Sequence, residues 1–204
     1  MPPSDTRRRF PWIKLLLILF VLFILMGLLF PGSRVGKAAR KAEAKNDETQ
    51  LVTSIKAFYT DYGYYPCENN NGDDNTDYFA ATGAEQGQLI DILRATNSPI
   101  VKKWNPQMTV YLDVPFAKDL NHPISGLGSD GAWYDPWGHP YLVKIDSNYN
   151  GIVLNPYSAN AGDAKLKMGV IVWSLGADGK GATSSTGGGD VNTGVFYDDV
   201  LSWH

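Results

Sequence analysis

An apolar run close to the first residue constrains this chain more than any other feature of its sequence. Residues 13–30 read IKLLLILFVLFILMGLLF, and Lys14 is the only charged side chain among them. As a helix, a run of this length extends about 27 Å, close to the roughly 30 Å hydrocarbon core of a bilayer. The run therefore predicts a single transmembrane helix, preceded by a basic leader at residues 1–12.

A cleaved secretory signal is the competing interpretation, because Arg7, Arg8 and Arg9 stand before the apolar run. The run is longer than a usual signal core, and it ends in Phe30-Pro31 instead of a small-x-small cleavage site. We therefore predict an uncleaved anchor. The distribution of basic residues does not determine the orientation of the helix in the membrane, since four precede Leu15 and five follow Phe30 within fifteen residues.

The rest of the chain is ordered and acidic. Hydrophobic residues make up 44% of the sequence and charged residues 19%, a profile that excludes disorder of the whole chain. From residue 46 onward, nine basic residues stand against nineteen acidic ones, a net charge of −10. This charge argues against nucleic acid as a partner. The single cysteine, Cys67, excludes an intramolecular disulfide and a cysteine-rich zinc site.

A second helix is expected after Pro31. Residues 37–62 contain neither Pro nor Gly, and apolar side chains recur at helical spacing, more strongly in the second half. Gly63 and Pro66 then supply the stop. We predict a helix at 31–63 that continues the membrane span and packs on a core; a plain juxtamembrane stalk is the alternative.

Short β-like runs follow, and they predict a small sheet. They lie at residues 109–114, 140–145, 151–154 and 169–175, after a short amphipathic helix at 88–96. Asn150-Gly151 predicts a hairpin between the second and third runs. The predicted fold class is α+β: one long N-terminal helix packed on a small, mainly antiparallel sheet, with residues 64–204 as a globular head.

No constellation points to catalysis. His122, His139 and His204 are scattered, and no nucleophile elbow, phosphate loop or dinucleotide fingerprint occurs. Cys67 has no basic partner nearby in sequence, which favours a partly buried thiol over a nucleophile. The prediction is that the protein is not an enzyme.

Two acidic segments are candidates for cation binding. Asp146, Asn148 and Asn150-Gly151 match half of a calcium loop, but Tyr157 stands where the bidentate Glu belongs, so an Asn-rich hairpin is favoured. Near the C-terminus, Asp178 follows a predicted strand, and Asp198-Asp199 are adjacent carboxylates with no Lys or Arg after Lys180. By spacing alone, a solvated acidic turn and a cation site are equally good interpretations of this second segment.

Four motifs, in order, resemble the pseudopilins of type II secretion, and among these the major pseudopilin. They are FYTDYGYYP (58–66), DPWGHPY (135–141), WSLGADG (173–179) and DDVLSW (198–203). The resemblance implies a pilin-like fold and a subunit of a periplasmic pseudopilus. It also implies a single-pass inner-membrane protein with a cytoplasmic leader and a periplasmic C-terminal domain. Its partners would be other pseudopilin-like subunits in a homo- or hetero-oligomer, the inner-membrane secretion platform and membrane lipid.

The resemblance also implies a bound Ca²⁺ ion in the loop after the last strand. Asp198 and Asp199 match the acidic pair of the family, and Asp178 lies in the matching turn. Asp190 is a further candidate ligand, because the excursion between Lys180 and Tyr197 is long.

The processing site departs from the family pattern. With Phe10 aligned as the first mature residue, Pro31 falls in the slot of the family's helix proline. Arg9, however, replaces the Gly before the cleavage point, and Lys14 replaces the Glu at the fifth mature position. We therefore expect no cleavage by prepilin peptidase and a minor, tip-like or permanently anchored subunit. The alternative is an anchored binding module for a glycan or an exported protein, although core packing is the commoner use of so many aromatic side chains.

Overall fold

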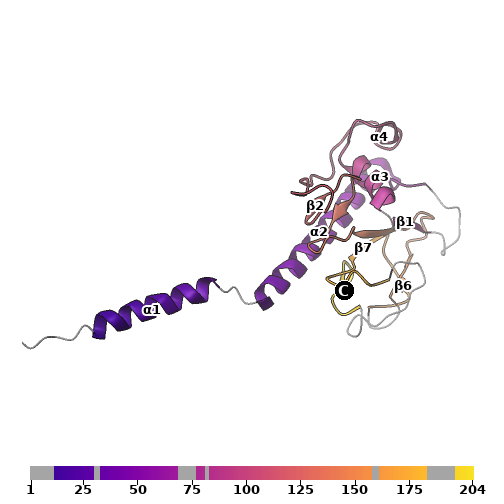
Figure 1. Ribbon diagram of the computed structural model, residues 1–204. Helices are drawn as coiled ribbons and strands as arrows, with labels where there is room; N and C mark the ends of the chain where they lie inside the picture. Colours follow the sequence, from indigo (N-terminus) through magenta and orange to yellow (C-terminus); the bar gives the residue numbers. More distant parts are fainter. Residues whose placement is uncertain (1–11, 30–32, 69–76, 81–82, 158–160, 183–195) are drawn as a thin grey trace, which may run out of the picture. The chain divides into compact units, whose positions relative to one another are not determined.

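The computed structural model describes residues 12–29, 33–68, 77–80, 83–157, 161–182 and 196–204 (Figure 1). The chain forms two compact units, Met1–Ala39 and Arg40–His204. The first contains the helix α1, Trp12–Leu29, and the start of α2, Ser33–Tyr62. The second contains the rest of α2 and every strand in the described part of the chain.

The predicted α+β fold, with one long helix that crosses the membrane and continues into the head, is wrong. The described residues contain four helices, and α1 and α2 are separate helices. None of the described helices has both the length and the apolar character needed to cross a bilayer. Residues 30–32, between α1 and α2, lie outside the described residues. Pro31 in this stretch gives a physical reason for two helices, since it lacks the amide hydrogen of a continuing helix and its ring clashes with the preceding turn.

A four-stranded antiparallel sheet organises the second unit. Its order is β1 (Tyr78–Ala80), β4 (Leu142–Ile145), β7 (Val170–Ser174) and β8 (Val200–Leu201). β4 and β7 are buried along their whole length. Because side chains alternate along a strand, Val143 and Val172 enter one core while Leu142 and Trp173 enter another on the opposite face.

Helices cover the first of these faces. Ala44, Leu51, Ile55 and Phe58 of α2 are fully buried and recur at the spacing of one helix face. They join the same core as α3, Gly83–Leu93, and α4, Pro99–Trp104. The sequence pattern therefore locates the helix, whereas the structure identifies its buried face, since Tyr59, which the apolar pattern includes, is 38% exposed.

The small strands differ from expectation. The predicted hairpin between 140–145 and 151–154 is wrong: β4 pairs with β1 and β7, whereas β5, Val153–Leu154, pairs with β6, Lys165–Leu166. The run 109–114 is not a strand, because the amides of Tyr111 and Leu112 both donate to the carbonyl of Leu93. A further two-stranded sheet joins β2, Gly126–Leu127, to β3, Trp133–Tyr134.

Candidate functional site

The sheet register places three of the four candidate metal ligands at the same end of the sheet. β7 ends at Ser174, which pairs with Val200, the first residue of β8. Asp198 and Asp199 directly precede β8, so they lie beside the turn that follows β7 and carries Asp178. Asp190, the fourth candidate, lies outside the described residues.

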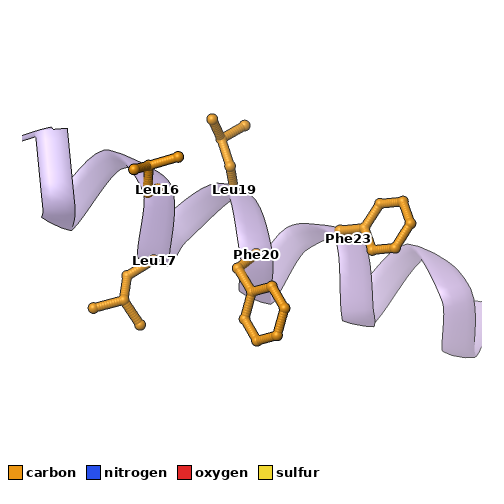
Figure 2. Close-up of a pocket in the computed structure, with 5 residues that line it drawn as sticks. All are labelled: Leu16, Leu17, Leu19, Phe20 and Phe23. Atoms are coloured by element: carbon orange, nitrogen blue, oxygen red, sulfur yellow. The ribbon is translucent and has the colours of Figure 1, made fainter.

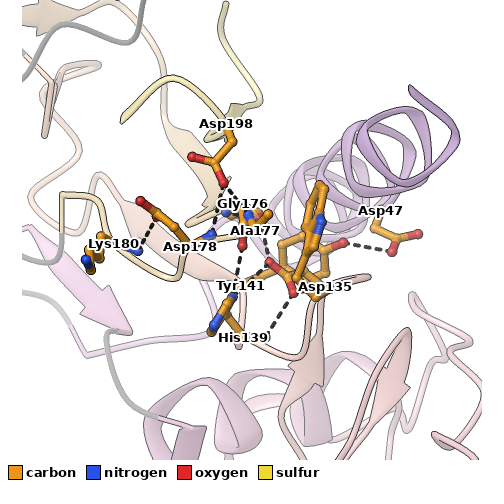
Figure 3. A network of polar contacts seen from close by, with 11 residues as sticks. Asp47, Asp135, His139, Tyr141, Gly176, Ala177, Asp178, Lys180 and Asp198 are labelled. Carbon is orange, nitrogen blue, oxygen red and sulfur yellow. Dashed lines mark hydrogen bonds and ion pairs between the residues drawn. The ribbon is translucent and has the colours of Figure 1, made fainter. Parts of the chain in front are cut away.

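Asp198 shapes this turn through backbone hydrogen bonds. Its Oδ2 accepts from the amides of Ala177, at 2.5 Å, and Asp178, at 3.0 Å (Figure 3). Asp178 in turn accepts from the amide of Lys180 at 2.8 Å. Gly176 has a φ of +62°, and a Cβ at this residue would lie 2.5 Å from the carbonyl oxygen of Asp198. The motif glycine is therefore required both by its backbone conformation and by the close approach of the acidic pair.

Asp199 is the buried member of the group. Its side chain is 5% exposed, and Oδ2 accepts a hydrogen bond from the Tyr157 hydroxyl. Oδ1 has no hydrogen-bond partner in the described part of the chain. The pKa of Asp199 is raised to about 7, mainly by burial. The charges of Asp198 and Asp178 act in the same direction, whereas the hydrogen bond from Tyr157 opposes the rise. A buried carboxylate oxygen without a partner, beside two other carboxylates, is an environment that a cation would stabilise.

The described residues do not complete a metal site by themselves. Within them, no group of three His, Cys, Asp or Glu side chains converges closely enough to hold an ion. The carboxylates of Asp178 and Asp198 accept amide hydrogens of the turn. Loop carbonyls and Asp190 would have to supply further oxygen ligands, since Ca²⁺ takes six to eight.

A second polar network joins two of the sequence motifs. Asp135 is fully buried; its Oδ1 accepts from the amides of Trp137 and His139, each at 2.9 Å. Its Oδ2 accepts from the Ser174 hydroxyl at 2.5 Å, and that hydroxyl accepts from the Gly176 amide at 3.0 Å. Burial raises the pKa of Asp135, while these hydrogen bonds favour its charged form. The DPWGH turn is thus hydrogen-bonded, through Asp135, to the last residue of β7.

The network reaches α2 through residues that the sequence analysis missed. The Tyr141 hydroxyl donates to Oδ2 of Asp47 at 2.8 Å (Figure 3). Burial raises the pKa of Asp47 to about 6. Glu48, the next residue, is fully buried. The available signal was its helical spacing from Ala44, Leu51 and Ile55, which puts an acidic residue on the apolar face of α2.

The Asn-rich segment forms a turn, but it is not the hairpin that the sequence predicted. Asp146 accepts from the amides of Asn150 and Gly151, at 3.2 and 2.7 Å. Asn148 accepts from the Asn150 amide, and Asn150 accepts from the Ile152 amide. These side-chain oxygens stabilise the backbone of the turn, which is the usual role of Asp and Asn in such a segment.

Of the three candidate processing residues, the structure describes only Lys14. Arg9 and Phe10 lie outside the described residues, whereas Lys14 is exposed on α1. Figure 2 shows five apolar side chains of the same helix standing away from its axis: Leu16, Leu17, Leu19, Phe20 and Phe23. From Leu15 to Phe23 the side chains are between 47% and 78% exposed.

Comparisons with protein-family models, with curated proteins and with solved structures find no match. The likeness to pseudopilins therefore rests on the motifs of the sequence, and the function that it implies is a proposal.

Proposed function

We propose that this protein is a non-catalytic structural subunit of a pseudopilin-like assembly that serves protein export. The observation that carries the proposal is the surface of α1. Its apolar side chains from Leu15 to Phe23 are at least 47% exposed. Exposed apolar surface of this extent usually marks a site of contact with another protein or with a membrane. Equivalent helices of neighbouring subunits would cover it by packing side by side.

The resemblance supplies the setting of this proposal. It puts the protein at the inner membrane, with its globular unit in the periplasm beside other pseudopilin-like subunits, membrane lipid and the secretion platform. Lys14 replaces the acidic residue of the family, so α1 brings a positive charge to the helix bundle. A minor or tip-like subunit accommodates this charge better than a repeating one, because like charges repel in a repeating contact.

Cysteine cross-linking of the full chain tests the assembly. Cys67 is replaced by Ala, and one new cysteine is introduced as Leu16→Cys or Phe20→Cys in the native cells. A photoreactive cross-linker attached to the new thiol should link these positions to a second copy or to another pilin-like subunit, which mass spectrometry identifies. The matched control is Met168→Cys, which is partly exposed on the globular unit and should cross-link far less. Only monomers at both α1 positions would refute the proposal.

We also propose that Ca²⁺ binds at Asp198 and Asp199, with Asp178 and Asp190 as further ligands. The unpartnered oxygen of Asp199 supports this. A chelator should lower the melting temperature of the protein and added calcium should restore it, because an ion that binds only the folded state stabilises it. Replacing both Asp198 and Asp199 by Ala should remove this response, whereas Asp113→Ala, at an exposed position, should keep it. A wild-type melting temperature that ignores both additions would exclude the ion.

An anchored binding module is the second candidate. Tyr59, Tyr65 and Tyr149 form a cluster, with ring centroids 4.5, 5.7 and 6.3 Å apart, and Tyr59 and Tyr149 are more than one-third exposed. Exposed aromatic rings of this kind favour contact with a glycan or an exported protein. Glycan-array binding by the wild type that Tyr59→Ala and Tyr149→Ala abolish would favour this candidate; recovery of pilin-like subunits alone would favour the first.

A further inference from the structure

Glu48 is a buried acidic side chain to which neither proposed function assigns a role. It lies on the face of α2 that packs on the sheet, and it is 0% exposed. Neither carboxyl oxygen has a hydrogen-bond partner among the described residues. The Ser174 amide faces the carboxyl and favours its charged form, but it makes no hydrogen bond of normal geometry with either oxygen.

The surroundings of Glu48 are predominantly acidic. The titratable and charged groups that face it come from α2 itself, from the turn after β3, from the residue before β4 and from the loop after β5: Lys45, Asp47, Asp135, Tyr141 and Tyr157. Lys45 is the only cation among them. Its ammonium donates to the carbonyl of Leu201 and, at 2.9 Å, to that of His204, and no ion pair joins it to Glu48 in the described part of the chain.

An ionised carboxylate in this position would be strongly destabilising. A charge that is removed from water without hydrogen bonds or an ion pair costs several kcal/mol. The neighbouring acids Asp47 and Asp135 add repulsion. The neutral acid avoids both penalties. Burial accordingly raises the pKa of Glu48 well above its usual range, and the charge of Lys45 only partly opposes this effect.

We propose that Glu48 is carried as a neutral carboxylic acid and that its ionisation loosens the packing of α2 on the sheet. The interface between α2 and β7 is then a pH-sensitive element of the globular unit. The protonated side chain is compatible with the apolar core, whereas the ionised carboxylate requires hydration by water that enters the interface. This inference does not depend on the proposed assembly or on calcium.

The direction of the pH effect follows from linkage. In the unfolded chain Glu48 titrates near pH 4.5. In the folded chain Glu48 keeps its proton to higher pH. Its contribution to stability is therefore complete below the pKa that it has in the unfolded chain, and it is lost as pH rises through the pKa that it has in the folded chain. Over that interval the unfolding equilibrium constant should rise by up to tenfold for each pH unit.

Thermal unfolding of the full chain between pH 4 and pH 9 tests the proposal, with Glu48→Gln as the variant. Gln has the same shape and cannot ionise. The variant should match the wild type near pH 4 and melt at a higher temperature above pH 7. Glu43→Gln, which is on an exposed position of the same helix, should follow the wild-type profile. A difference between wild type and Glu48→Gln that stays constant over the whole pH range would overturn the proposal.

Infrared spectroscopy of the folded wild type provides a measurement that does not depend on the stability of the variant. A protonated buried carboxyl group has a C=O stretch that a carboxylate lacks. At neutral pH this band should be present, and labelling of the glutamate carboxyl groups with ¹³C should shift it. Absence of a protonated glutamate band at neutral pH would show that Glu48 is ionised and would refute the proposal.

Discussion

At the scale of single residues, identical chemical groups have different environments in this protein. Asp135 and Glu48 are both fully buried carboxyl groups. Asp135 accepts hydrogen bonds from two amides and a hydroxyl, whereas Glu48 has no hydrogen-bond partner in the described part of the chain. The first therefore organises a turn, and the second is a source of pH sensitivity. Sequence alone does not distinguish the two, because hydrogen-bond partners come from elsewhere in the chain.

Asp135→Asn tests the importance of the buried network. The amide keeps the shape of the side chain but replaces one acceptor oxygen with a donor, which faces either the two backbone amides or the Ser174 hydroxyl. We expect a loss of about 2–3 kcal/mol in the free energy of unfolding, since a buried donor is left without an acceptor. Denaturant unfolding measures the loss. Asp113→Asn, at an exposed position, is the control, and equal effects of the two substitutions would contradict the role of the network.

At the scale of elements, the turn after β7 is the feature that the motifs describe. Ser174, Gly176 and Asp178 each have a role in it, through Asp135, the close approach of Asp198 and the Lys180 amide. A Cβ at Gly179 would lie 2.5 Å from Nε2 of His139. The WSLGADG and DPWGHPY motifs are therefore two halves of one structural unit.

Gly176→Ala and Gly151→Ala form a matched pair that tests this turn. Both glycines have positive φ, and an added Cβ at Gly151 meets nothing within 4 Å. Gly151→Ala should lower the free energy of unfolding by about 1–2 kcal/mol, which is the cost of holding Ala at a positive φ. Gly176→Ala should lose about 1–3 kcal/mol more, because its Cβ overlaps the backbone of Asp198. Equal losses in denaturant unfolding would show that the approach of Asp198 imposes no constraint.

At the scale of the whole molecule, the buried core belongs to the second unit. Among the described residues, the buried hydrophobic side chains begin at Ala44. The second unit begins at Arg40. The acidic turn, the buried network and Glu48 all lie within it, so the first unit contributes none of these groups.

A fragment of residues 40–204 should therefore unfold cooperatively at nearly the melting temperature of the full chain. A fragment that begins at Thr53 should not, since it lacks the buried side chains of Ala44 and Leu51, and removal of a single buried Leu side chain typically costs about 2–5 kcal/mol. Circular dichroism during heating compares the two fragments. A large drop in melting temperature for 40–204 would mean that the first unit stabilises the second.

The leader gives a further prediction at this scale. Arg9 replaces the Gly that precedes the prepilin cleavage point in the family that the chain resembles. The protein isolated from its native cells should therefore keep the residues before Phe10. Intact mass and N-terminal sequencing decide this, and a chain that begins at Phe10 would show that processing tolerates Arg9.

The sequence by itself determined the local features of the molecule. Apolar periodicity located α2, and runs of β-branched residues located β4 and β7, because such patterns reflect short-range geometry. The tertiary structure alone decided the rest. It determined the buried face of α2, paired β5 with β6 instead of β4, joined Tyr141 to Asp47 and joined Ser174 to Asp135. These contacts join residues far apart in the chain, and burial and hydrogen bonding depend on which distant segments meet.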